Sequence, residues 1–122
     1  LAVVGTVVTA GRSAHSVIRH AGDFLVCCSL DGSLLHGDRE VYRGQRFPRG
    51  LCVTNEHIII GGSDYGKRSD RNRLRGSVTV LDMEYHALAE FEVPGMVQEI
   101  RRTEGFDLGL SNSARRMDAA TA

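Results

Sequence analysis

The stretch from Phe47 to Asp82 constrains the fold more than any other part of the chain. It contains two short apolar runs, 49–53 and 58–63, joined by a tight polar turn, and a third run, 76–81, that comes after a long basic loop. Runs of about five residues bounded by Asn, Gly and Asp are typical of antiparallel strands, and no helical period separates them. The sequence therefore predicts an all-β fold.

The remainder of the chain continues this pattern. Apolar runs separated by turn residues predict further strands at 3–9, 15–19, 24–29, 33–36, 40–42 and 87–93. Asp31 and Gly32 form the Asp-Gly pair that most often marks a two-residue hairpin. Apolar and acidic residues alternate from Ala89 to Val93, as expected for a strand with one solvent-facing side.

An internal repeat favours one fold class among the all-β architectures. The run that starts at Phe24 matches the run that starts at Ile58, 34 residues later, and a third run that starts at Phe106. A short strand precedes each copy at the same spacing and places Ile18, Cys52 and Ile100 at one equivalent buried position. Repeats of this length, with about four strands each, are typical of β-propeller blades.

The repeat also predicts the domain organisation. Residues 1–112 form a propeller-like segment with units at about 14–48, 49–96 and 97–112; the strand at 3–9 belongs to a preceding unit. The second unit carries about ten extra residues between its second and third strands, because Asp31-Gly32-Ser33 matches Arg75-Gly76-Ser77 at an offset of 44. The small, polar tail 113–122 is expected to be disordered.

Two and a half units are fewer than the roughly four to eight blades that close a propeller ring. Three alternatives arise: a segment of a larger propeller, several copies that complete one, or a small β-sandwich. We favour the segment, and Leu1 in place of an initial Met agrees with it. Unpaired edges and bare sheet faces predict self-association or marginal stability.

One run resembles a known group of proteins. Phe47-Pro48-Arg49-Gly50-Leu51, together with the run 58–63 and Lys67-Arg68 after it, is similar to a blade of bacterial six-bladed propeller proteins, which are distantly similar to the NHL and YVTN repeat groups. The resemblance covers roughly residues 14–102. It implies a propeller architecture and a bacterial cytoplasmic setting, and it implies no activity.

Composition excludes several classes of protein. Fifteen basic and fifteen acidic residues cancel, so no overall field draws the chain to nucleic acid or to an anionic membrane. No apolar run approaches the roughly 20 residues that cross a bilayer, and we expect a cytoplasmic protein with no membrane partner. The three cysteines lie in apolar runs, two of them adjacent at Cys27 and Cys28, which predicts buried, reduced thiols.

Candidate site residues lie where the first strand of each unit begins. In a propeller these strand ends open toward the central channel, so His15 and Arg49 are expected at its mouth, where they could bind an anion or polarise a carbonyl. Glu99 and Arg101 lie at the same end of the third unit, and Glu99 replaces an apolar residue of the repeat. The alternative for these residues is a purely local role in turns or at an exposed edge.

The loop 63–75 carries five basic residues, including Lys67 and Arg68, against two acidic residues, with Tyr65 available for stacking. A solvated loop is the simpler explanation, and nucleic acid is the less favoured partner. The five histidines show no metal-binding spacing, and no phosphate loop, nucleophile elbow or dinucleotide motif occurs. The sequence therefore predicts neither a metal nor a cofactor.

Together these features predict a propeller segment that binds a small anionic ligand or a protein partner. One alternative is a lyase or hydrolase acting on a sugar or anionic metabolite, with His15 as general base and Arg49 as anion clamp. Another is nucleic-acid contact through the basic loop. The fold does not select among them, since propellers host unrelated functions.

Overall fold

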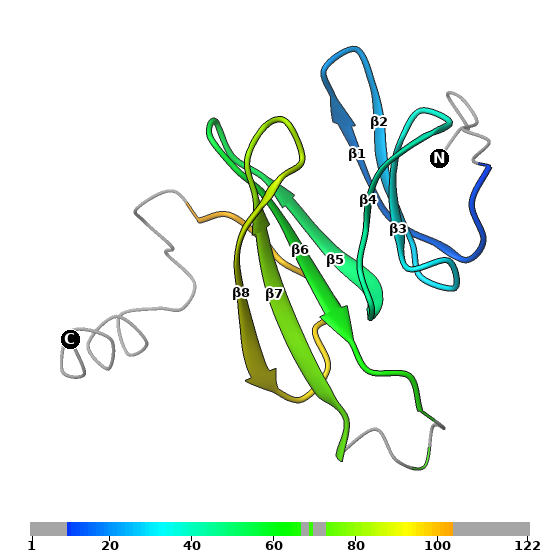
Figure 1. Ribbon diagram of the computed structural model, residues 1–122, viewed down its shortest axis with the longest axis vertical. Helices are drawn as coiled ribbons and strands as arrows, with labels where there is room; N and C mark the ends of the chain where they lie inside the picture. Colours follow the sequence, from blue (N-terminus) through cyan, green and yellow to red (C-terminus); the bar gives the residue numbers. More distant parts are fainter. Residues whose placement is uncertain (1–9, 67–68, 70–72, 104–122) are drawn as a thin grey trace, which may run out of the picture.

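The computed structural model describes residues 10–66, 69 and 73–103 of the chain. These residues form an all-β structure without an α-helix, in which two four-stranded antiparallel sheets pack against each other (Figure 1). The first sheet contains β1 (Ala14–His20), β2 (Asp23–Cys28), β3 (Ser33–His36) and β4 (Arg39–Arg43). The second contains β5 (Phe47–Val53), β6 (Ile58–Ser63), β7 (Arg75–Leu81) and β8 (Ala87–Pro94). The all-β prediction is confirmed.

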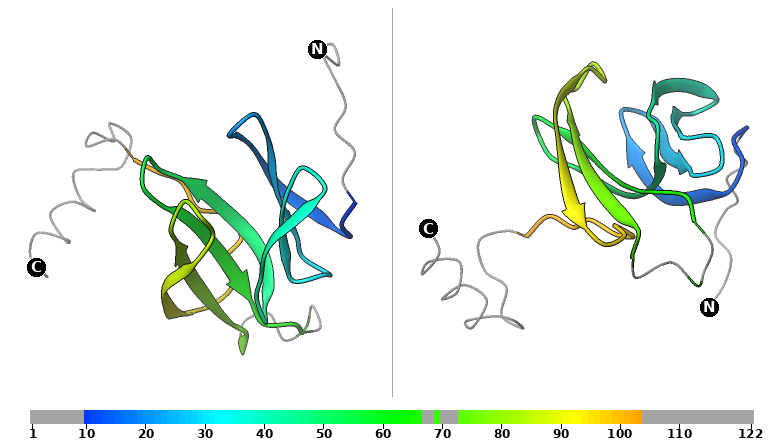
Figure 2. Two further views of the ribbon diagram at one scale, coloured as in Figure 1. Left: turned by 45° about the horizontal axis from the view of Figure 1, so that its top comes forward. Right: turned by 60° about the horizontal axis from the view of Figure 1, so that its bottom comes forward.

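Each sheet is a simple meander in which sequence neighbours pair. The spatial orders are β1-β2-β3-β4 and β5-β6-β7-β8, and the chain passes from the last strand of one sheet to the first strand of the next. Figure 2 shows the two sheets from two further directions, with β4 leading into β5. Among the described residues, no helix has the length and apolar character needed to cross a membrane.

Short connections fix the hairpins. Ala21 and Gly22 both have positive φ, 46° and 82°, which matches the twist of the strands that they join. Thr54 Oγ1 accepts hydrogen bonds from the amides of Glu56 and His57 at 3.3 and 3.0 Å and closes the turn before β6. The two-residue hairpin predicted at Asp31–Gly32 is wrong in length, because β2 ends at Cys28 and the connection takes four residues.

Every strand predicted between residues 15 and 93 overlaps an observed one. The predicted strand 3–9, the run 106–111 and the tail 113–122 lie outside the described residues. Residues 97–101, predicted as the first strand of a third unit, are not a strand. They lie on the second sheet near Gly50 and Gly61, and the main chain of Val97 bonds to the Ser63 hydroxyl rather than to a strand backbone.

The core lies between the two sheets. Its members are at most 4 % exposed: Leu25, Cys27 and Leu34 from the first sheet, and Leu51, Ile58, Ile60 and Leu81 from the second. Full burial of one Leu or Ile side chain contributes about 1.5–3 kcal/mol, so these residues account for much of the cohesion between the sheets. A second cluster, Val26, Cys28 and Leu35, lies on the opposite face of the first sheet. All three cysteines are buried as reduced thiols, as predicted.

Candidate ligand-binding site

The first strands of both sheets are interrupted by a β-bulge near their beginning. The register of β1 shifts between His15 and Val17, and that of β5 shifts between Pro48 and Gly50. Ser16 and Arg49 are therefore the extra residues, and the hydroxyl of Ser16 donates to the main-chain carbonyl of Arg49. A bulge bends its strand and redirects a side chain, so Arg49 leaves the regular alternation of β5.

His15 lies close enough to Arg49 to respond to its charge. Partial burial and, to a lesser degree, the positive charge of Arg49 lower the pKa of His15 below its usual value. The imidazole is therefore neutral at neutral pH, while the guanidinium is charged. The structure brings these two predicted residues together at one end of β1 and β5.

The guanidinium of Arg49 has no carboxylate partner among the described residues. Arg49 is half-buried, and none of the ion pairs or side-chain hydrogen bonds in this part of the chain involves its guanidinium. Asp64 lines the same pocket but pairs with Arg46, with 3.1 Å between Arg46 Nε and Asp64 Oδ1. A half-buried cation without a counter-charge is an electrostatic site for an anion.

A pocket of about 180 Å³ adjoins Arg49. Its walls combine serine hydroxyls, apolar side chains and an aromatic pair: Ser13, Ser29, Leu30, Phe47, Arg49, Asp64, Tyr65, Gly66, Leu74 and Met96. The rings of Phe47 and Tyr65 lie 4.9 Å apart, and Tyr65 is 80 % exposed. The pocket thus offers one positive charge, hydroxyl groups and an aromatic wall.

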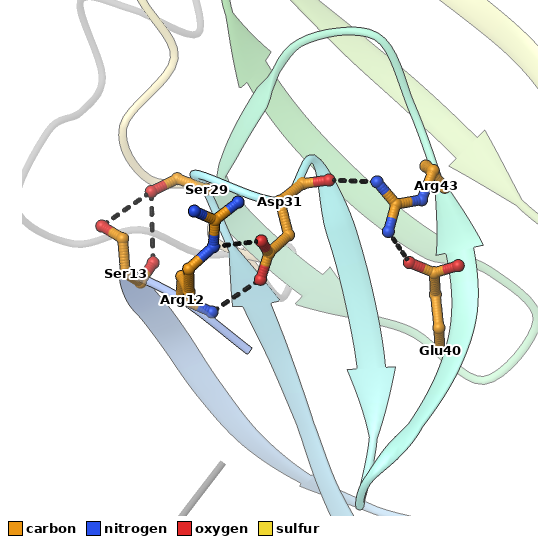
Figure 3. A network of polar contacts seen from close by, with 6 residues as sticks. All are labelled: Arg12, Ser13, Ser29, Asp31, Glu40 and Arg43. Atoms are coloured by element: carbon orange, nitrogen blue, oxygen red, sulfur yellow. Dashed lines mark hydrogen bonds and ion pairs between the residues drawn. The ribbon is translucent and has the colours of Figure 1, made fainter. Parts of the chain in front are cut away.

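A polar network positions Ser13 at the edge of this pocket (Figure 3). The Ser29 hydroxyl donates to the carbonyl of Ser13 at 3.1 Å and lies 3.0 Å from its hydroxyl; Ser13 Oγ lies 3.4 Å from His15 Nε2. Next to it, Asp31 accepts from the amide and guanidinium of Arg12 at 2.6 and 2.7 Å. These bonds hold the segment before β1 against the β2–β3 connection.

The same network perturbs a carboxyl group. Hydrogen bonds from the Arg12 amide and guanidinium hold the pKa of Asp31 below its usual value, because they favour the ionised form. Arg43 donates to the main-chain carbonyl of Asp31 at 2.7 Å and to Glu40 Oε1 at 2.5 Å. Figure 3 shows the two arginines approaching Asp31 from β4 and from the segment before β1.

Glu99 and Arg101 pair with each other. Arg101 Nε donates to Glu99 Oε1 at 2.8 Å, and both side chains are exposed. The backbone of residues 99 and 100 packs against Gly50, one residue after Arg49. In the described part of the chain, no hydrogen bond or ion pair joins Glu99 or Arg101 to His15 or Arg49.

The basic loop is described only in part. Lys67 and Arg68 lie outside the described residues. At the end of the loop, Arg75 Nη1 lies 3.5 Å from Glu92 Oε2, so its charge has a partner.

One cluster was not identified from the sequence. Asp82, Glu84 and His86, in the connection from β7 to β8, place one potential metal ligand each within 4.8 Å of the others. The D-x-E-x-H run was the available signal. Asp82 Oδ1 accepts from the amides of Glu84 and His86 at 2.8 and 2.9 Å, which lowers the pKa of Asp82 and closes its own turn. The turn alone therefore explains the arrangement.

Pocket residues such as Met96 and Phe47 were also not singled out as site residues. Comparisons of the chain with protein-family models, curated proteins and solved structures gave no match. Function is therefore inferred from the geometry around Arg49.

Proposed function

We propose that the chain is a ligand-binding module and that it binds a small anion at the Arg49 pocket. One observation carries the proposal: a half-buried guanidinium on a β-bulge, without a carboxylate partner in the described part of the chain, lines a pocket. A carboxylate or phosphate would supply the missing counter-charge through charge-assisted hydrogen bonds, which are stronger than neutral ones.

The remainder of the pocket narrows the class of ligand. At about 180 Å³ it is smaller than the roughly 300–1,000 Å³ typical of sites for drug-sized molecules. Phe47 and Tyr65 provide an aromatic wall, while Ser13 and Ser29 provide hydroxyls. These features suit a small carboxylate with a short apolar part better than a large polyanion.

The module itself is proposed to be a pair of successive β-propeller blades. Two observations support this. Leu25 and Cys27 of the first sheet face the second sheet. The residues 34 positions later, Ile59 and Gly61, lie on the face of the second sheet that contacts Val97. Each sheet thus turns the equivalent face toward the next segment of the chain. In such an arrangement, the bulged beginnings of β1 and β5 lie at the channel end.

The test is a calorimetric titration of the protein against a panel of small carboxylates and phosphates. Loss of the guanidinium in Arg49→Ala should weaken binding by about 10- to 150-fold, since a hydrogen bond to a charged group contributes about 1.5–3 kcal/mol. Arg39→Ala is the matched control, because Arg39 is exposed on β4 and does not line the pocket. Equal affinity in Arg49→Ala and Arg39→Ala, with unchanged thermal melting, contradicts the proposal.

A further inference from the structure

A larger cavity, of about 560 Å³, lies between the two sheets. Leu34 and Tyr42 of the first sheet face Ile60, Thr79 and Glu90 of the second across it, and the connection from β4 to β5 lines it as well. It shares no lining residue with the Arg49 pocket. We refer to it as the inter-sheet cleft.

The sequence explains why this cleft is not filled. On the facing side of the second sheet, the large apolar residues Ile58 and Leu81 pair with each other and belong to the core. Farther along the same strands, Gly62 pairs with Ser77, and these two residues are too small to reach the first sheet. The sheets therefore touch at one end and leave space at the other.

Two residues that carry hydroxyl groups, Ser77 and Thr79, line the cleft. They are 3 % and 7 % exposed. A hydroxyl group on the wall of a cleft can both donate a hydrogen bond to a ligand or water and accept one from it.

Arg46 adds a donor to the same wall. Its Nε and Nη2 atoms pair with Asp64 and Glu92 at 3.1 and 3.2 Å. Its third nitrogen, Nη1, is buried and has no hydrogen-bond partner in the described part of the chain. The charge of Arg46 is therefore compensated, while one of its donors is still available for a neutral acceptor.

Glu90 and Tyr42 approach the cleft from opposite sheets. Burial and, to a lesser degree, the negative charge of Glu90 raise the pKa of the Tyr42 phenol. Glu90 takes part in no ion pair among the described residues, so its carboxylate is an available acceptor. An aromatic face opposite a carboxylate can pack against the C–H groups of a sugar ring while accepting hydrogen bonds from its hydroxyls.

From this arrangement we infer that the inter-sheet cleft binds a neutral carbohydrate. Arg46, Thr79 and Ser77 supply donors and Glu90 supplies an acceptor, which matches a molecule whose hydroxyls both donate and accept. An anion is disfavoured because Glu90 and Glu92 line the cleft and both arginines that line it, Arg43 and Arg46, already have carboxylate partners. The volume lies within the range of small-molecule sites.

The test is a titration monitored by amide chemical shifts, with glucose, galactose, mannose, maltose and cellobiose as probes, and spermidine and acetate as charged comparisons. At least one sugar should shift the amides of Gly44, Gly62 and Thr79. Glu90→Gln and Thr79→Val should each weaken that binding by roughly tenfold, because each removes one polar contact to the sugar. Glu56→Gln, in the exposed turn before β6, is the matched control and should leave it unchanged.

Arg49→Ala should also leave sugar binding intact, which separates this cleft from the anion pocket. Three results overturn the inference: no sugar shifts the cleft amides, only spermidine or acetate does so, or Glu90→Gln and Thr79→Val bind the sugar as well as Glu56→Gln does. A sugar that shifts amides around Arg49 and none in the cleft also counts against it.

Discussion

At Gly61, the segment that comes after β8 packs directly against the backbone of the second sheet. A Cβ atom at residue 61 would lie 2.2 Å from Cγ1 and 3.0 Å from Cβ of Val97, and 3.1 Å from Cδ1 of Ile100. The first distance is far below van der Waals contact. Gly61→Ala should therefore displace Val97 or bend β6, and it should destabilise the fold.

The magnitude results from two opposing effects. Overpacking of a close-packed contact costs about 1–3 kcal/mol, whereas replacing Gly by Ala restricts the unfolded chain and returns about 0.4–1 kcal/mol. A net loss of about 1–2 kcal/mol is expected. At about 4–8 °C per kcal/mol for a domain of this size, the melting temperature should fall by roughly 4–16 °C.

Urea unfolding monitored by circular dichroism measures this loss, and Gly44→Ala is the control. At residue 44 the nearest atom to a new Cβ is a ring carbon of Tyr42 at 3.4 Å, an ordinary contact. In a Val97→Ala background, which removes Cγ1, the cost of Gly61→Ala should shrink by about 1 kcal/mol. An unaltered midpoint in Gly61→Ala, or an equal cost in both backgrounds, refutes the placement of Val97 on the second sheet.

Two further predictions concern titrating groups. Burial and, to a lesser degree, the neighbouring Cys28 raise the pKa of Cys27 to about 12. Maleimide at about pH 7.5, which is below the ordinary thiol pKa, should therefore leave Cys27 unmodified until urea unfolds the chain. Fast labelling of Cys27 in the native protein, found by peptide mapping, contradicts this prediction. The pKa of Asp31 is lower in the folded state than in the unfolded chain, so its contact with Arg12 stabilises the fold fully above the ordinary carboxyl pKa of about 4. This stabilisation is lost as the pH falls through the pKa of Asp31 in the folded state. Asp31→Asn should flatten the decline of melting temperature between about pH 5 and 2, and an unchanged decline counts against the contact.

The strands could be predicted because their signal is local. Apolar runs of five to seven residues alternate with turn residues such as Thr54 and Gly22, and both sets of preferences act within a few residues of chain. The exposed side of β8 could not be predicted in the same way. Phe91 alternates with acidic neighbours as a buried residue would, yet it is 57 % exposed, because β8 is the last strand of its sheet.

The segment 97–101 shows a second limit of local pattern. Its apolar spacing matches that of β5, but a strand also requires a neighbour with which to exchange backbone hydrogen bonds. In the described residues, Val97 instead uses its amide and carbonyl on the Ser63 side chain. Ile100, expected at a buried position, is half-buried and packs near Gly50 and Gly61, and the predicted strand conformation of this segment is wrong.

The candidate site depends on which arginine pairs with Asp64, and no local sequence pattern determines that pairing. The sequence places Arg49 at the start of a strand and offers Asp64, fifteen residues later, as a counter-charge in the same pocket. The fold gives that carboxylate to Arg46 instead, because the connection from β4 brings Arg46 within 3.1 Å of it. Had Asp64 paired with Arg49, the pocket would contain a compensated ion pair and little attraction for an anion. The proposed anion site thus depends on the path of the β4–β5 connection, and Arg46 of the same connection also lines the inter-sheet cleft.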